Sequence, residues 1–268
     1  MASPAPVTTQ TLLRLKADSE KIAVVTSYDA SFTSLLEAAG VEVLLVGDSL
    51  GMVLQGHDST LPVTLDDMIY HSACVARTAK HALRVVDLPF MSYATVTQAL
   101  HSAARMMREG GVHMVKLEGG ERRLETVTAL TQEGIPVCGH LGLTPQSVHQ
   151  LGGYRVQGRD EEAARQLLDD ALGLEQAGAS MLVLECIPAA LARQVSERLR
   201  IPVIGIGAGV DCDGQVLVLY DLLGITPGRR PKFSHNFLEQ GRDIPAALSA
   251  YVEAVKAGRF PAPEHTLA

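Results

Sequence analysis

Four acidic residues of this chain directly follow short apolar segments, at the point where a β-strand would end. They are Asp48, Asp87, Glu118 and Glu185. If the segments are parallel strands of one barrel, their carboxyl ends surround one mouth and the carboxylates come together. Carboxylates that share a site repel one another and acquire raised pKa values unless a cation joins them. The spacing therefore predicts either a metal site or a protonated acid.

Magnesium fits this set of acids better than zinc does. Mg²⁺ binds few carboxylates in near-octahedral geometry and keeps positions for water or substrate, whereas zinc favours Cys and His, which do not occupy these positions. Taken singly, Asp48 or Asp87 could instead be a helix N-cap. Four acids at equivalent positions favour a shared site, because an acid that ends an apolar strand is costly to bury without a partner.

Two further side chains are expected at the same end of the barrel. Lys116 precedes Glu118 by two residues, so both point to one face of a strand. A cation there would bind a substrate carboxylate or stabilise enolate charge, and a structural ion pair is the alternative. His140 ends another apolar segment and is either part of the site or structural. Glycines at 205–209 suggest a phosphate-binding loop or one kept slim beside a bulky substrate.

Eight β-branched or leucine-rich segments, each bounded by Gly, Pro or Asp, are predicted to be strands. They are Ile22–Ser27, Val43–Val46, Leu83–Val86, Met114–Leu117, Val137–Gly139, Met181–Leu184, Val203–Ile206 and Val216–Tyr220. Helical patterns between them, at Ser31–Ala39, Thr97–Glu109 and Glu161–Ala177, predict parallel crossovers. Eight βα units predict an α/β fold, the (β/α)8 TIM barrel. Residues 209–215 leave little room for a seventh crossover helix.

The length of 268 residues suits one barrel domain, which we expect to span residues 1–268. Residues 1–8 are expected to be flexible, and the amphipathic pattern at Thr9–Lys16 predicts a short N-terminal helix. Residues 232–268 are expected to form a C-terminal extension. Within it, Ile244–Ala257 predicts a helix that covers the barrel or reaches a neighbour.

Composition favours a small-molecule enzyme of the cytoplasm. The net charge of −7 and the aromatic content of 4% argue against nucleic acid or an anionic membrane as the main partner. The four cysteines form no CxxC pair and are expected to be reduced. The first residues lack the basic and apolar regions of a signal peptide, and no apolar stretch reaches the ~18 residues of a membrane span.

Eight segments together resemble the ketopantoate hydroxymethyltransferase family over nearly the whole chain. The segments are VGDSLGMVLQGHDSTLPVT (46–64), DLPFMSYAT (87–95), MVKLEGGE (114–121), PVCGHLGLTPQSV (136–148), GGYRVQGR (152–159), LVLECIP (182–188), IPVIGIGAG (201–209) and PKFSHNF (231–237). The series is specific because the segments occur in order and at compatible spacing. No segment alone would be.

The resemblance implies a transferase of pantothenate biosynthesis that acts on 3-methyl-2-oxobutanoate chelated to one Mg²⁺ per subunit. The co-substrate would be 5,10-methylenetetrahydrofolate and the product 2-dehydropantoate. The implied metal residues are Asp48, Asp87 and Glu118, and the implied base is Glu185. The implied substrate contacts are Asp48, Ser49, Asp87, Lys116 and His140.

An alternative is a magnesium-dependent barrel lyase of the phosphoenolpyruvate mutase and isocitrate lyase type. Those enzymes commonly carry a catalytic Cys in a mobile loop, and the candidate loop GMVLQGHDST contains none. A barrel without catalytic activity is disfavoured by the full set of acids. The family resemblance also implies a homo-oligomer, namely a homodecamer.

Overall fold

The computed structural model describes residues 5–226, 228 and 230–267. Within these residues, eight parallel strands pair in chain order, and β8 pairs with β1 to close a barrel. The strands are β1 (Ile22–Thr26), β2 (Val43–Val46), β3 (Leu83–Asp87), β4 (Met114–Glu118), β5 (Val137–Gly142), β6 (Met181–Glu185), β7 (Val203–Ile206) and β8 (Gly214–Leu217). The predicted TIM barrel is confirmed.

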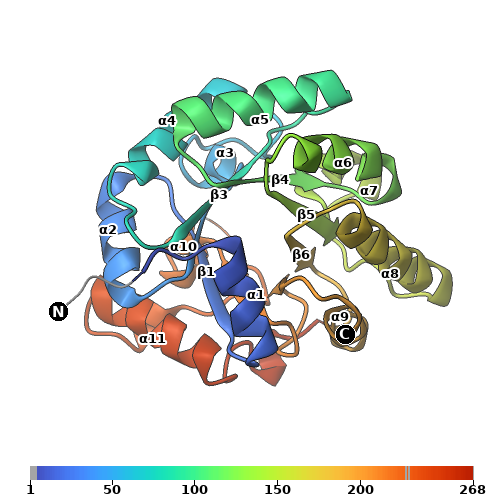
Figure 1. Ribbon diagram of the computed structural model, residues 1–268. Coiled ribbons are helices and arrows are strands. Elements are labelled where there is room, and N and C mark those ends of the chain that lie inside the picture. Colours follow the sequence, from blue (N-terminus) through green and yellow to red (C-terminus); the bar gives the residue numbers. More distant parts are fainter. Residues whose placement is uncertain (1–4, 227, 229, 268) are drawn as a thin grey trace.

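Helices surround the strands (Figure 1). The α-helices are α1 (Thr9–Ala17), α2 (Ala30–Ala39), α3 (Leu50–Val53), α4 (Leu65–Ala76), α5 (Val96–Gly110), α6 (Leu124–Gln132), α7 (Val148–Leu151), α8 (Glu161–Gln176), α9 (Ala189–Arg198), α10 (Leu219–Leu222) and α11 (Ile244–Lys256). The 3₁₀ turns are η1 (Glu121–Arg123), η2 (Pro145–Ser147), η3 (Phe237–Glu239) and η4 (Pro263–His265). None of the helices in the described ranges has the length and apolar character that a membrane span requires.

The strands alternate between two apolar layers, because successive side chains of a strand point to opposite faces. Residues such as Val25 and Leu44 face the helices. The other set fills the barrel interior: Ile22, Val24, Val43, Leu45, Leu83, Val85, Met114, Cys138, Met181, Val183, Ile204, Ile206 and Val216. This period of two decides which later residues on each strand reach the mouth of the barrel.

The prediction for the eighth strand, Val216–Tyr220, was wrong by two residues at its start and by three at its end. The strand is Gly214–Leu217, and the apolar residues after it begin α10 at Leu219. Gly214 lies so close to β1 that an added Cβ would overlap the carbonyl oxygen of Ile22. A periodicity argument does not detect such a glycine, since it contributes backbone pairing and no apolar side chain.

The seventh crossover contains no helix in the described chain, as predicted. Two lysines before the first strand stabilise this connection instead. Lys21 Nζ donates to the carbonyl oxygens of Val210, at 3.1 Å, and Cys212, at 2.5 Å. Lys16 Nζ pairs with Asp213 at 2.5 Å, and the same carboxylate oxygen accepts a hydrogen bond from the N–H of Val203.

The helices near the two ends of the chain pack against different parts of the barrel. The predicted N-terminal helix is α1, and its Leu12 packs with the interior layer and is fully buried. The C-terminal helix α11 packs against α2 and β1. Its Tyr251 hydroxyl lies 2.9 Å from the carbonyl oxygen of Val24 and 2.8 Å from that of Gln215. Of the two roles predicted for this helix, it performs the first and covers the barrel.

The first residues of the chain fall partly outside the described part. Residues 1–4 are not described, so the prediction of flexibility at 1–8 is untested there. Val7 donates a backbone hydrogen bond to His81 at 2.7 Å, and Thr8 caps α1 with its side chain. Residues 232–267 follow α10 and contain η3, α11 and η4, and α11 packs against the barrel.

Candidate active site

Five of the predicted site residues lie at the mouth of the barrel because they continue the interior layer. They are Asp87, Lys116, Glu118, His140 and Glu185. Each follows an interior residue of its own strand by two or four positions, as Asp87 follows Val85. The prediction that Lys116 and Glu118 share a face is confirmed. Both are buried, as are Asp87 and His140, whereas the side chain of Glu185 is 14% exposed.

Asp48 reaches the same place by a different route, since its strand ends at Val46. Gly47 occupies the interior position, where an added Cβ would lie 2.8 Å from Ser49 Oγ and 3.5 Å from an Asp87 oxygen. This glycine leaves room for the neighbouring carboxylate. The backbone N–H of Asp48 then donates to Asp87 Oδ2 at 3.1 Å.

The acids are not helix caps in the described structure. Ser49 precedes α3 without a side-chain capping bond, and Thr95 caps α5. The positions before η1 and α9 belong to Gly120 and Pro188. The alternative interpretation of these acids as N-caps is therefore excluded.

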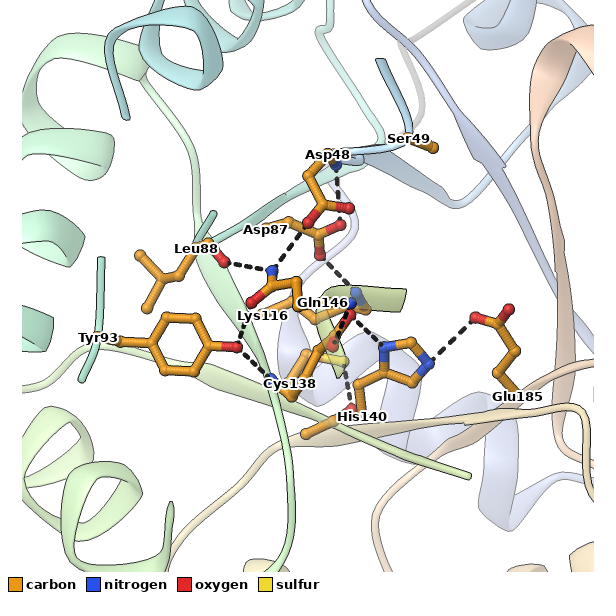
Figure 2. A network of polar contacts seen from close by, with 12 residues as sticks. Asp48, Ser49, Asp87, Leu88, Tyr93, Lys116, Cys138, His140, Gln146 and Glu185 are labelled. Atoms are coloured by element: carbon orange, nitrogen blue, oxygen red, sulfur yellow. Dashed lines mark hydrogen bonds and ion pairs between the residues drawn. The ribbon is translucent and has the colours of Figure 1, made fainter. Parts of the chain in front are cut away.

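Lys116 is the cation at the centre of the cluster, as Figure 2 shows. Its Nζ lies 2.5 Å from Asp87 Oδ1. Burial lowers the pKa of Lys116, but the charges of Asp87, Glu118 and Asp48 raise it by more, so the pKa lies above its ordinary value and the amine stays charged.

His140 lies between two carboxylates. Its Nδ1 is 3.5 Å from Glu118 and its Nε2 is 3.2 Å from Glu185. Both nitrogens are buried, and within the described residues neither has a well-directed hydrogen bond. Burial and the charge of Lys116 lower the pKa of His140, but the two carboxylates raise it further, and the net pKa is above its ordinary value.

Gln146 and Tyr93 belong to this network, and the sequence did not single them out. Gln146 Nε2 donates to Asp48 Oδ2 at 2.8 Å and to the carbonyl of Leu88 at 2.9 Å. Its backbone N–H donates to Glu118 Oε2 at 3.1 Å, and its Oε1 accepts from the Tyr93 hydroxyl at 2.5 Å. The only signal in the sequence was the membership of both residues in the motif segments 87–95 and 136–148.

Ser49 also lines the mouth, and its hydroxyl lies 2.9 Å from that of Tyr28. The glycine-rich segment after β7 lies close to the C-terminal extension. At Gly207 an added Cβ would lie 3.0 Å from Phe233 and 3.1 Å from Leu267. This segment is therefore slim because two apolar side chains pack over it.

The site opens into a cavity of about 370 Å³. The acids, Lys116 and His140 line one part of it. Much of the remaining wall is apolar, and the residues that form it include Met52, Leu143, Val156, Val183, Phe233 and Leu267. The cavity can thus hold a small polar group beside the acids and a larger apolar group beyond it.

The excess of buried negative charge suits a cation. The pKa of Asp48 is raised well above its ordinary value by burial and by the charges of Asp87 and Glu118. Among the described residues, no three acidic, His or Cys side chains already converge as a complete metal site. The oxygens of Glu118 contact Gln146 and His140. A pair of carboxylates fits Mg²⁺, because this ion needs few protein ligands and keeps water and substrate oxygens at its other coordination positions.

Comparison with known proteins decides the family. A family model described as ketopantoate hydroxymethyltransferase matches residues 6–263. The chain belongs to the ketopantoate hydroxymethyltransferase family. This membership confirms the resemblance inferred from the motifs, and it places the chain in a family of enzymes.

Curated relatives match the chain along nearly its full length. The 3-methyl-2-oxobutanoate hydroxymethyltransferase of Shewanella denitrificans is 59% identical over 261 residues, which are 97% of this chain and 98% of the relative. The protein of that name from Nitrosococcus oceani is 61% identical over 250 residues, covering 93% and 95% of the two chains. The chain is therefore similar to these members of the hydroxymethyltransferase family along nearly the full length of both chains.

Solved structures resemble this hydroxymethyltransferase family member in fold. A phosphonopyruvate hydrolase complex with oxalate and Mg⁺⁺ aligns with a TM-score of 0.60 at 10% identity, covering 78% of this chain and 80% of that one. A 2,3-dimethylmalate lyase of the PEP mutase/isocitrate lyase superfamily aligns with a TM-score of 0.53 at 19% identity, covering 75% and 72%. Identities this low show a common barrel, so they add no support for the alternative lyase activity.

Proposed function

We propose that the chain transfers a hydroxymethyl group from 5,10-methylenetetrahydrofolate to 3-methyl-2-oxobutanoate. One molecule of water is consumed, and the products are 2-dehydropantoate and tetrahydrofolate. The observation that carries the proposal is a buried group of acids around Lys116 at one end of a largely apolar cavity. The names of the curated relatives support the choice of substrate.

Asp48 and Asp87 would hold a magnesium ion, with Glu118 beside them. The raised pKa of Asp48 supports this assignment, because a divalent cation would relieve the repulsion that raises it. When bound, the ion would supply a Lewis acid that draws electrons from the keto oxygen of the 2-oxo acid and so acidifies its C3–H bond.

Glu185 would act as the general base that removes the proton from C3. Its side chain is 14% exposed and lines the cavity, whereas those of Asp87 and Glu118 are 6% exposed. His140 Nε2 lies 3.2 Å from its carboxylate. A base must lie within hydrogen-bond reach of the atom it deprotonates, so C3 of the substrate would lie next to this carboxylate.

Lys116 would contribute fixed positive charge. Its ammonium group is already oriented by Asp87 and is buried, where electrostatic interactions are stronger than in water. Negative charge that develops on the substrate's oxygens is therefore stabilised without reorganisation of the site. His140 and the hydroxyl of Ser49, which line the same cavity, are the further substrate contacts in this proposal.

The apolar part of the cavity would receive the folate. A 2-oxo acid of this size fills only a fraction of about 370 Å³, and the space left is lined by side chains such as Val156 and Phe233. A flat heterocycle packs well against such walls. The methylene carbon of the donor would then lie near C3 of the deprotonated substrate, and water would supply the hydroxyl oxygen.

The test is an assay of the purified protein with 3-methyl-2-oxobutanoate, methylenetetrahydrofolate and Mg²⁺. We expect 2-dehydropantoate to form, and a chelator to stop its formation. Absence of product above background would reject the proposed function. Assembly as a homodecamer and a cytoplasmic location also stay predictions, and light scattering on the same preparation checks the assembly.

A further inference from the structure

Gln146 contacts two acids of the cluster, and the proposed function gives it no role. It belongs to η2 and is only 7% exposed. Through its side chain and its backbone it contacts Asp48, Glu118 and Tyr93. These partners come from the loops after β2 and β3 and from the end of β4, and Figure 2 shows the amide between Asp48 and Tyr93.

The orientation of the amide group follows from its partners. The carbonyl of Leu88 can only accept a hydrogen bond, so the atom 2.9 Å from it must be the nitrogen. The second hydrogen of this nitrogen then points to Asp48 Oδ2, at 2.8 Å. The oxygen of the amide faces the Tyr93 hydroxyl, at 2.5 Å. All polar atoms of the amide are thus used, and the reversed orientation would place oxygen against two acceptors.

The same residue also determines the position of a second acid, because its backbone N–H holds Glu118 Oε2 at 3.1 Å. Gln146 therefore holds both Asp48 and Glu118, and it determines the spacing between them. The geometry points to Gln146 as a positioning residue that orients Asp48 for binding of the divalent cation. This inference rests on the proposed function, since it concerns the cation assigned to that site.

Tyr93 supports Gln146 from the other side. Its hydroxyl is directed at the amide oxygen, and the guanidinium of Arg123 lies 4.7 Å from the centre of its ring. Arg123 also donates a hydrogen bond to the backbone carbonyl of Tyr93 at 3.2 Å. Because outer residues that orient metal ligands typically change metal affinity by about 10–100-fold when replaced, the effect should be measurable in binding alone.

The first experiment measures Mn²⁺ binding by electron paramagnetic resonance, without substrate. Gln146→Leu has nearly the same size, retains the backbone N–H to Glu118 and loses both side-chain donors. We expect its dissociation constant for Mn²⁺ to rise by about 10–100-fold. Gln150→Leu, an exposed residue four positions further on, is the matched control and should bind as the wild type does.

A second readout separates positioning from general damage to the fold. At saturating Mg²⁺ the turnover of Gln146→Leu should recover to within about threefold of the wild type, because the effect is on cation affinity and not on the base. A Gln146→Leu protein that binds Mn²⁺ like the control overturns the inference. So does a reduced turnover that added Mg²⁺ fails to restore.

Tyr93→Phe covers the case in which Gln146→Leu does not fold. It removes one hydroxyl, so the amide loses the partner of its oxygen, and we expect weaker Mn²⁺ binding by about 2–10-fold. Unchanged binding in that variant would then contradict the inference. If the wild type itself binds no Mn²⁺, the metal site of the proposed function fails, which is a different outcome from equal binding by wild type and variants.

Discussion

Lys116 Nζ lies 2.5 Å from Asp87 Oδ1 within the barrel, where both side chains are only 6% exposed. Removing one partner of such a pair leaves an unpaired buried charge. We therefore expect Lys116→Met to lower the free energy of unfolding by about 3–5 kcal/mol in urea denaturation. The control is Arg193→Met. Its ion pair with Glu197 is more than 60% exposed on both sides and should contribute at most about 1 kcal/mol. If both variants lower the free energy of unfolding equally, the buried pair of Lys116 and Asp87 is no more stabilising than an exposed one.

Glu185→Gln should nearly abolish exchange of the C3 proton of 3-methyl-2-oxobutanoate with deuterated solvent. The loss should be about 10²–10⁴-fold, because the amide keeps the shape of the base but cannot accept the proton. Nuclear magnetic resonance follows the exchange directly. Glu197→Gln, which changes an exposed acid, should exchange normally, and Mn²⁺ binding should persist in both variants. Exchange at the wild-type rate in Glu185→Gln would exclude this residue as the base.

Asp48→Asn should stabilise the metal-free protein while it abolishes tight cation binding. The folded pKa of Asp48 is raised by burial and by neighbouring acids, so the unfolded chain ionises first as pH rises. Below the pKa of Asp48 in the unfolded chain, this residue therefore does not lower the free energy of unfolding. Between that pKa and the higher pKa of the folded protein, it lowers the free energy of unfolding by about 1.4 kcal/mol for each pH unit.

The measurement for Asp48→Asn compares both proteins by urea denaturation with a chelator, at pH 4 and at pH 7. The advantage of the variant should be larger at pH 7, because the penalty on the wild-type carboxylate grows as the pH rises above the pKa of the unfolded chain. The asparagine side chain of the variant still offers an oxygen to Gln146 Nε2, so the network is retained. If the free energy of unfolding of the variant at pH 7 does not exceed that of the wild type, the buried Asp48 carboxylate does not destabilise the metal-free protein.

Gly142→Ala should disturb the base through the backbone. Gly142 has a φ of 91°, and an added Cβ would overlap the carbonyl oxygen of Glu185. Gly152 provides the control: its φ is 68°, but nothing lies within 4 Å of its Cβ position. Both alanine variants should lose about 1–2 kcal/mol to the left-handed backbone. Only Gly142→Ala should also lose C3 proton exchange, by about tenfold or more. Equal exchange rates in the two variants would contradict this assignment.

Local pattern predicted the part of the site that lies on strands. Asp87, Lys116, Glu118 and Glu185 lie at or next to the ends of apolar runs, and the period of two decides their common face without knowledge of the rest of the chain. The eighth strand shows the limit of this reasoning. Its apolar run belongs partly to β8 and partly to α10, and a short apolar run does not distinguish the two.

The sequence by itself therefore determined the barrel, the strand-borne acids and the family, because strand periodicity is local and the motif series is specific. Only the tertiary structure decided the partners of those acids. Gln146 is 98 residues from Asp48 and 53 from Tyr93 along the chain. Such contacts depend on how separate loops fold over the mouth of the barrel, and no periodic pattern records them. The contact between Gln146 and Asp48 therefore depends on the tertiary structure, which places the loops after β2 and β5 side by side.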